Sequence, residues 1–203
     1  MERLEAISKL KTLAGCELHS MADKLGVPVY KNGHVNKGWA GHVMERFLEL
    51  PINSAQSPNF GSWELKSIPL CYKRNGSLRF KETMAITMID PVNVCQKEFE
   101  HSHLLSKLRK AVVVSRIVGK TVDDPSYVHS VIELDLTGAI LEAVKVDYDE
   151  VRRVCMDPSK GFSSLSGKMG YYIQPRTKGA GHGSTSRAFY ARPRFLAQFI
   201  SLE

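Results

Sequence analysis

An apolar run, Ala111-Val112-Val113-Val114-Ser115, is the feature that most limits how this chain can fold. Three successive β-branched residues favour an extended strand over a helix. Further strands are expected at residues 83–89, 131–136, 170–174 and 189–190, where apolar residues form short runs or alternate with polar ones. The fold must therefore contain β-sheet.

Segments with the periodicity of helices intermix with these strands. Helices are expected over residues 1–13, 18–26, 37–50, 101–110, 139–156 and 194–202. Residues 27–36 are expected to form a loop, and residues 72–77 a basic turn with an Asn-Gly signal. Because there is no regular βαβ repeat, the sequence predicts a mixed α+β (α/β) fold. A length of 203 residues fits a single domain over residues 1–203.

Composition and charge narrow the classes of function. With 43% hydrophobic and 24% charged residues, the chain resembles a globular protein rather than a disordered one. A net charge of +7 suits a polyanionic partner, although a merely basic surface gives the same number. Four widely spaced cysteines without a Cys-x-x-Cys pair favour free thiols over a zinc site or disulfides. No segment is apolar enough to span a bilayer or to act as a signal peptide, so we expect a cytoplasmic protein without membrane partners.

The pair Glu64 and Lys66 carries the candidate chemistry. Side chains two residues apart on a strand point to the same face, so both groups could converge on one phosphate. Hydrolysis of a phosphodiester uses Mg²⁺ held by carboxylate oxygens, and a lysine can orient water and stabilise the developing charge. Glu45, on the preceding expected helix, offers a second carboxylate. Alone, the pair does not distinguish such a site from the solvated edge of a strand.

A basic, glycine-rich segment follows the expected strand at 170–174. Within residues 175–187, Arg176 and Lys178 could contact bases or phosphates, and the glycines would let the backbone approach a duplex. A surface hairpin explains the same composition, and on this segment alone it is the preferred interpretation. The glycine spacing does not match a Walker motif, so binding of a nucleoside triphosphate is not expected.

Several short motifs occur in an informative order along nearly the whole chain. They are KGWAGHVME at 37–45, ELKSIP at 64–69, ET at 82–83, KLRK at 107–110, QPRTK at 174–178 and RAFY at 187–190. Together they resemble the MutH/Sau3AI family of DNA endonucleases, with its KGWxGxxxE helix, ELKTIP strand, QxRxK segment and RGFYLK segment. The resemblance implies a restriction-endonuclease-like core, with two lobes flanking a DNA-binding cleft.

The resemblance also implies catalytic roles for the matching positions. Glu64 carries over as a catalytic, metal-binding carboxylate and Lys66 as the catalytic lysine. Glu45 carries over as an accessory acidic residue at the metal site. Lys37 corresponds to an active-site contact to a base, and Lys107 to a support for the scissile phosphate.

Five further positions are implied to bind DNA. Glu82, Arg176 and Lys178 match positions that read bases in those enzymes, which recognise GATC. Arg187 lies in the segment similar to RGFYLK. Tyr190 matches a tyrosine that senses adenine methylation in the mismatch-repair member.

Asn59 departs from the family pattern, which has an aspartate metal ligand at this position. An asparagine oxygen can contact Mg²⁺ but lacks the full negative charge. The chain could be an engineered inactive variant, a natural non-cleaving binder, or an enzyme in which a neighbour such as Glu45 replaces the charge. The first interpretation is preferred because the other catalytic positions are kept.

We therefore predict a Mg²⁺-dependent, sequence-specific endonuclease for double-stranded DNA. The preferred form, by a narrow margin, is a type II restriction-like enzyme with a GATC-type site, impaired here at Asn59. The alternative is a methyl-directed mismatch-repair nicking endonuclease, which would need a repair partner protein. Two alternatives are not nucleases: a non-cleaving DNA-binding module of the same fold, and an RNA-binding protein.

Overall fold

The computed structural model describes residues 1–50, 61–179 and 185–202. The helices are α1 (Arg3–Lys11), α2 (Leu18–Lys24), α3 (Trp39–Phe47), α4 (Pro91–Gln96), α5 (His103–Leu108), α6 (Gly138–Met156) and α7 (Pro193–Leu196), with 3-10 turns η1 (Phe99–His101) and η2 (Phe162–Ser164). The strands are β1 (Tyr30–Lys31), β2 (His34–Val35), β3 (Glu64–Tyr72), β4 (Leu78–Phe80), β5 (Met84–Met88), β6 (Lys110–Val118), β7 (Ser126–Asp135), β8 (Ile173–Thr177) and β9 (Arg187–Ala191).

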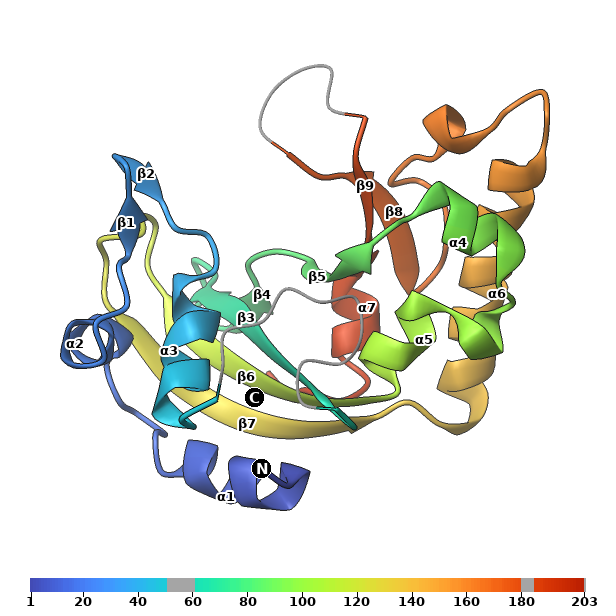
Figure 1. Ribbon diagram of the computed structural model, residues 1–203. Helices are drawn as coiled ribbons and strands as arrows, with labels where there is room; N and C mark the ends of the chain where they lie inside the picture. Colours follow the sequence, from blue (N-terminus) through green and yellow to red (C-terminus); the bar gives the residue numbers. More distant parts are fainter. Residues whose placement is uncertain (51–60, 180–184, 203) are drawn as a thin grey trace.

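A four-stranded sheet in the order β4-β3-β6-β7 forms the centre of the fold (Figure 1). Strands β3 and β6 are parallel, with Lys66 opposite Val113, while β4 and β7 run antiparallel to their neighbours. Residues 111–114 of β6 are completely buried, as a strand covered on both faces requires. The strand expected over residues 111–115 is therefore confirmed.

Two hydrophobic clusters cover the two faces of this sheet. Leu65, Val112 and Val114 pack with α1, α2 and α3, whereas Ile68 and Val113 pack with α5, α6 and the second sheet. Alternation along a strand explains the division, since neighbouring residues point to opposite faces. The mixed α+β fold is thus confirmed, and the two clusters form its two lobes.

The second sheet is antiparallel, in the order β5-β9-β8. Figure 1 shows β8, β9, α4 and α6 on one side of β3, and α2, α3 and the β1–β2 hairpin on the other. Strand β5 connects the two sheets in sequence, and the carbonyl of Ile86 in β5 accepts a hydrogen bond from Lys66 of β3. This contact brings the second sheet to the start of β3.

Several boundaries differ from those predicted. The expected loop at 27–36 contains the β1–β2 hairpin, whose Asn32-Gly33 turn has positive φ at both residues. Strand β8 begins at Ile173 instead of Gly170, because the buried Asp147 carboxylate accepts the backbone N–H groups of residues 171–173. Helix α7 ends at Leu196, and the N–H groups of Gln198 and Phe199 beyond it bond three residues back.

Two predictions from composition can be compared with the structure directly. All four cysteines are free thiols, as expected. Across the described ranges 1–50, 61–179 and 185–202, no helix has both the length and the apolar character needed to cross a bilayer.

Candidate active site

Glu64 lies at the first position of β3 and is held between two lysines. Its side chain is 1% exposed, and Lys66 Nζ lies 2.8 Å from one carboxylate oxygen. Lys107 Nζ, from α5, lies 3.1 Å from the other oxygen. Burial lowers the pKa of Lys107, and the charge of Glu64 opposes that shift. Three of the predicted catalytic residues therefore form one compact charged group.

The group lies at an open edge of the central sheet. Strand β4 pairs with β3 only at Leu70–Tyr72, so within the described chain β6 is the only strand whose backbone pairs with residues 64–68. Sheet edges leave backbone groups accessible to other molecules. A ligand could therefore approach the beginning of β3 from this edge.

A cavity of about 230 Å³ at this edge brings together four predicted site residues: Lys37, Glu45, Lys66 and Glu82. Helix α3 buries Trp39, Val43 and Met44 in the core, and Glu45 of the same helix is only 7% exposed. The Ser67 hydroxyl also lines the cavity and has no hydrogen-bond partner among the described residues. A buried hydroxyl without a partner is uncommon in proteins and is consistent with a place for a polar ligand.

The second sheet presents Arg176 and Tyr190 beside this site. The Arg176 guanidinium lies over the Tyr190 ring, 5.4 Å from its centroid, and donates a 3.0 Å hydrogen bond to Thr83 Oγ1. Burial raises the pKa of Tyr190, with Glu82 adding to the shift and Arg176 opposing it. The charges of two predicted base-reading side chains, Arg176 and Glu82, therefore both reach Tyr190.

Lys178 follows β8 and lies close enough to Lys66 for their charges to interact. Loss of hydration and the positive charge of Lys66 both lower the pKa of Lys178. Its backbone N–H bonds to the Ser186 carbonyl at 2.9 Å, which closes the base of the predicted basic segment. Lys178 thus brings part of the predicted basic segment close to the candidate active site.

Arg187 has a different environment from the other predicted DNA-binding residues. Its Nε donates to the Leu165 carbonyl, its Nη1 donates to the Thr185 carbonyl, and its guanidinium lies 6.0 Å from the Phe162 ring centroid. These contacts hold the chain around η2 against β9. Asn59, the remaining predicted catalytic and metal-binding residue, lies outside the described residues.

The sequence prediction did not include Arg116 of β6, which also lines this cavity. Its Nη1 donates a 3.1 Å hydrogen bond to Ser126 Oγ, and its guanidinium lies 5.6 Å from the Trp39 ring centroid. No local motif marks Arg116, because its partners come from α3 and β7. An arginine close behind the apolar run of this strand was the one available signal.

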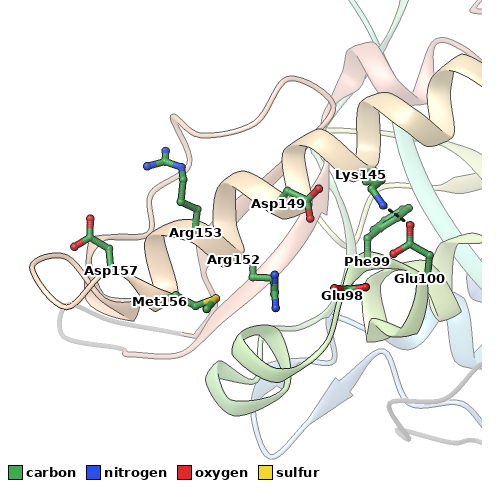
Figure 2. A pocket seen from close by; sticks show the side chains of 9 residues that line it. All are labelled: Glu98, Phe99, Glu100, Lys145, Asp149, Arg152, Arg153, Met156 and Asp157. Carbon is green, nitrogen blue, oxygen red and sulfur yellow. Dashed lines mark hydrogen bonds and ion pairs between the residues drawn. The ribbon is translucent and has the colours of Figure 1, made fainter.

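A larger cavity, of about 680 Å³, lies on the other lobe, between α6 and the segment around Phe99. Figure 2 shows Lys145 directed toward Glu100, while Arg153 and Asp157 lie toward the C-terminal end of α6. None of the predicted site residues lines this cavity, and its acidic and basic side chains are mixed. Size alone therefore does not identify the functional site here.

Part of this chain is similar in sequence to known DNA mismatch repair enzymes. The family model of the DNA mismatch repair enzyme MutH matches residues 48–134, a segment that contains Glu64, Lys66, Glu82 and Lys107. The DNA mismatch repair protein MutH of Vibrio parahaemolyticus is 32% identical over 112 residues, which cover 54% of this chain and 48% of that protein. The chain thus spans about half the length of the Vibrio relatives that it matches.

Two further proteins are similar over a greater length. The MutH protein of Haemophilus influenzae is 23% identical over 215 residues, which cover 97% of this chain and 93% of that protein. A solved complex of the restriction endonuclease MvaI with its cognate DNA has a TM-score of 0.38 and 12% identity, covering 90% of this chain and 95% of that one. The sequence comparisons confirm that this chain resembles the MutH/Sau3AI family of DNA endonucleases.

Proposed function

We propose that this chain is a Mg²⁺-dependent DNA endonuclease that nicks duplex DNA in mismatch repair, within a single domain over residues 1–203. The observation that carries the proposal is the buried Glu64 carboxylate between Lys66 and Lys107, at an open sheet edge. A carboxylate with nearby ammonium groups suits phosphoryl chemistry, because both signs of charge are needed around a phosphodiester.

The described donor groups suit a magnesium ion. Mg²⁺ is commonly held by one or two carboxylates, with waters and substrate phosphates completing the octahedron. Glu64 and Glu45 provide two carboxylates whose charges both reach Lys107. Within the described ranges, no group of three or more His, Cys, Asp or Glu residues could hold a metal. Position 59, which lies outside the described residues, would provide a further protein ligand. When bound, Mg²⁺ would activate water and neutralise charge on the phosphate.

The two lysines would have separate tasks. Lys66 is fixed by Glu64 at 2.8 Å and by the Ile86 carbonyl at 3.1 Å, so its ammonium is already oriented at the edge of β3. From there it could hold the attacking water and stabilise the charged transition state. Lys107 is more deeply buried and would keep Glu64 ionised, and it would support the scissile phosphate.

Base recognition would come from the second sheet and the adjacent turn. Arg176 could donate two hydrogen bonds to a guanine, and Glu82 could accept one from a cytosine amino group. Lys178 and Lys37 would contact bases or phosphates nearby, and Tyr190 would sense adenine methylation. Together these residues suit a GATC-type site, while Arg187 would support the recognition segment.

Mismatch-repair nicking is favoured over restriction activity, which the sequence analysis preferred by a narrow margin. The support is that the similar curated proteins carry the name of a mismatch repair protein. Such an enzyme would act in the cytoplasm, together with a repair partner that stimulates its own weaker cleavage. A restriction enzyme would share the active site but cut both strands without a partner.

The test compares the chain with its Asn59→Asp variant on a supercoiled plasmid containing one GATC site, with Mg²⁺. We expect Asn59→Asp to raise cleavage by orders of magnitude and to produce nicked circles from unmethylated and hemimethylated plasmid only. Linear product from the unmethylated plasmid would favour the restriction enzyme. Tight DNA binding without cleavage by either protein would favour a non-cleaving module, and preference for duplex RNA would reject a DNA enzyme.

A further inference from the structure

A second cavity, of about 340 Å³, adjoins the candidate active site. It lies between the β2 end of the hairpin, the start of α3 and the β6–β7 turn, and it shares Lys37, Glu82 and Arg116 with the 230 Å³ cavity. Lys81 and Lys120 also line it. The shared residues make the two cavities one continuous surface along the edge of β3.

Arg116 lies where the two cavities meet, and its position is set by the sheet. Pro69 of β3 is opposite Arg116 in the parallel β3–β6 pair, two residues beyond Ser67 in the active-site cavity. A bulge between Ser115 and Arg116 interrupts the β6–β7 pairing. Bulges commonly change the direction in which a side chain points. Two residues of a strand span about 7 Å, so Arg116 lies about one such step along the sheet from Ser67 in the active-site cavity.

The Arg116 side chain is positively charged, largely buried and incompletely satisfied. Its Nη1 bonds to Ser126 Oγ, but its Nε is buried without a hydrogen-bond partner in the described structure. No carboxylate of the described residues lies within 4.0 Å of it, and Glu82 acts on it only at longer range. A buried cation without a close counter-ion is unfavourable, and binding an anion would relieve that penalty.

A network of contacts from three elements holds the guanidinium in place. Trp39 lies beneath it, and the His19 ring lies 4.6 Å from the Trp39 ring. Glu17 accepts the backbone N–H of Ser126 at 3.1 Å and also accepts from His19. Such support pre-organises a side chain for a ligand and lowers the entropy lost on binding.

We propose that Arg116, with Lys37 beside it, binds a backbone phosphate of the DNA strand next to the scissile one. The proposal rests on the proposed endonuclease function and adds a phosphate subsite that the motif resemblance does not supply. A phosphate fits because its oxygens accept the parallel N–H groups of a guanidinium. Lys81 is less suited to this role, since its Nζ already donates to the carbonyls of Gly119 and Lys120.

The experiment measures binding of a labelled 20-base-pair duplex in EDTA, so that no cleavage occurs, across a range of salt concentrations. Each phosphate contact contributes a slope of about −0.9 to log Kobs against log[salt]. We expect Arg116→Met to weaken binding about tenfold and to make the slope shallower by about one. Arg116→Lys should keep the slope but bind a few-fold more weakly, because the ammonium lacks the planar fork.

Arg153→Met is the matched control, since this exposed arginine of α6 lines the other cavity (Figure 2). It should bind as the parent chain does. If the parent chain binds DNA and Arg116→Met binds with the same slope, the phosphate subsite is wrong while the nuclease proposal stands. If the parent chain does not bind duplex DNA at low salt, both proposals fail. Should Arg116→Met not fold, Arg116→Gln provides the same loss of charge, and thermal melting verifies its fold.

Discussion

The ammonium group of Lys107 lies 3.1 Å from one carboxylate oxygen of Glu64 and 3.3 Å from the other. The two side chains are 6% and 1% exposed, so this ion pair is almost completely removed from water. Lys66 completes the group from the same strand as Glu64. A buried carboxylate with two cations is stable only while its partners remain, which makes the group testable without any substrate.

Replacing Lys107 by methionine should destabilise the fold, because Glu64 would keep only Lys66 as a partner. Breaking a buried ion pair costs about 3–5 kcal/mol, and the remaining lysine should reduce this to about 2 kcal/mol in the free energy of unfolding by urea. The double variant Lys107→Met/Glu64→Gln should recover part of the loss. Lys110→Met, at an exposed position, is the control and should change little. Equal stability of Lys107→Met and the parent would show that the pair does not form.

Glu17 should link stability to pH. Burial raises the pKa of its carboxyl, but hydrogen bonds from the N–H groups of Ser20 and His19, from the His19 ring and from Ser126 N–H outweigh burial and lower that pKa to about 2. The folded pKa lies below the ordinary 4.5, so the stabilisation is complete above pH 4.5 and is lost as the pH falls toward 2.

Glu17→Gln should therefore lower the free energy of unfolding by about 2 kcal/mol at pH 7, and the difference from the parent should shrink toward pH 2. Glu142→Gln, at an exposed site on α6, should show no such pH-dependent difference. Denaturant unfolding at a series of pH values measures both. A Glu17→Gln deficit that does not change with pH would contradict the assigned hydrogen bonds.

Local sequence patterns predicted most elements of the fold but not how they assemble. The run 111–115 identified β6 because burial on both faces requires continuous apolar residues. Helix α4 was missed, although Asp90 caps it and Pro91 occupies its first turn. The pairing of β5 with β9 joins segments about a hundred residues apart, which no local pattern encodes.

For the candidate site too, the sequence predicted some residues, whereas others are recognised only in the assembled fold. The spacing of Glu64 and Lys66 placed both on one strand, and the motif resemblance selected Glu45 and Lys107 from other elements. The structure brings all four together. Arg116 was missed, because its partners Trp39 and Ser126 meet it only through the packing of α3 and β7 on β6. Glu17 likewise gains its role from a contact across the fold.

The pairing of Arg176 with Tyr190 should matter for sequence discrimination. Arg176→Ala should reduce the preference for the target sequence over a fully paired duplex with an altered target sequence. The reduction should be about 10–100-fold, because one bidentate base contact is worth about 1–3 kcal/mol. Tyr190→Leu should cost only a few-fold, since it removes the ring that supports the guanidinium. Competition binding with matched duplexes measures both.

Arg194→Ala is the control for this comparison. Arg194 also lies over a tyrosine ring, 4.4 Å from the centroid of Tyr171, but it lines neither active-site cavity. Its loss should leave discrimination unchanged. An equal loss in Arg176→Ala and Arg194→Ala would assign the effect to general charge instead of base reading.

The central claim is that the Glu64 carboxylate serves a Mg²⁺-dependent DNA cleavage site. The most direct measurement is single-turnover cleavage of a GATC duplex by Asn59→Asp and by Asn59→Asp/Glu64→Gln, as Mg²⁺ is titrated. Glutamine keeps the shape of the side chain and removes its charge. We predict that cleavage by Asn59→Asp requires Mg²⁺ and that the added Glu64→Gln change lowers its rate at least a hundredfold, roughly the 3 kcal/mol expected of one catalytic charge. Equal rates for the two proteins, or cleavage that persists in EDTA, would contradict the account.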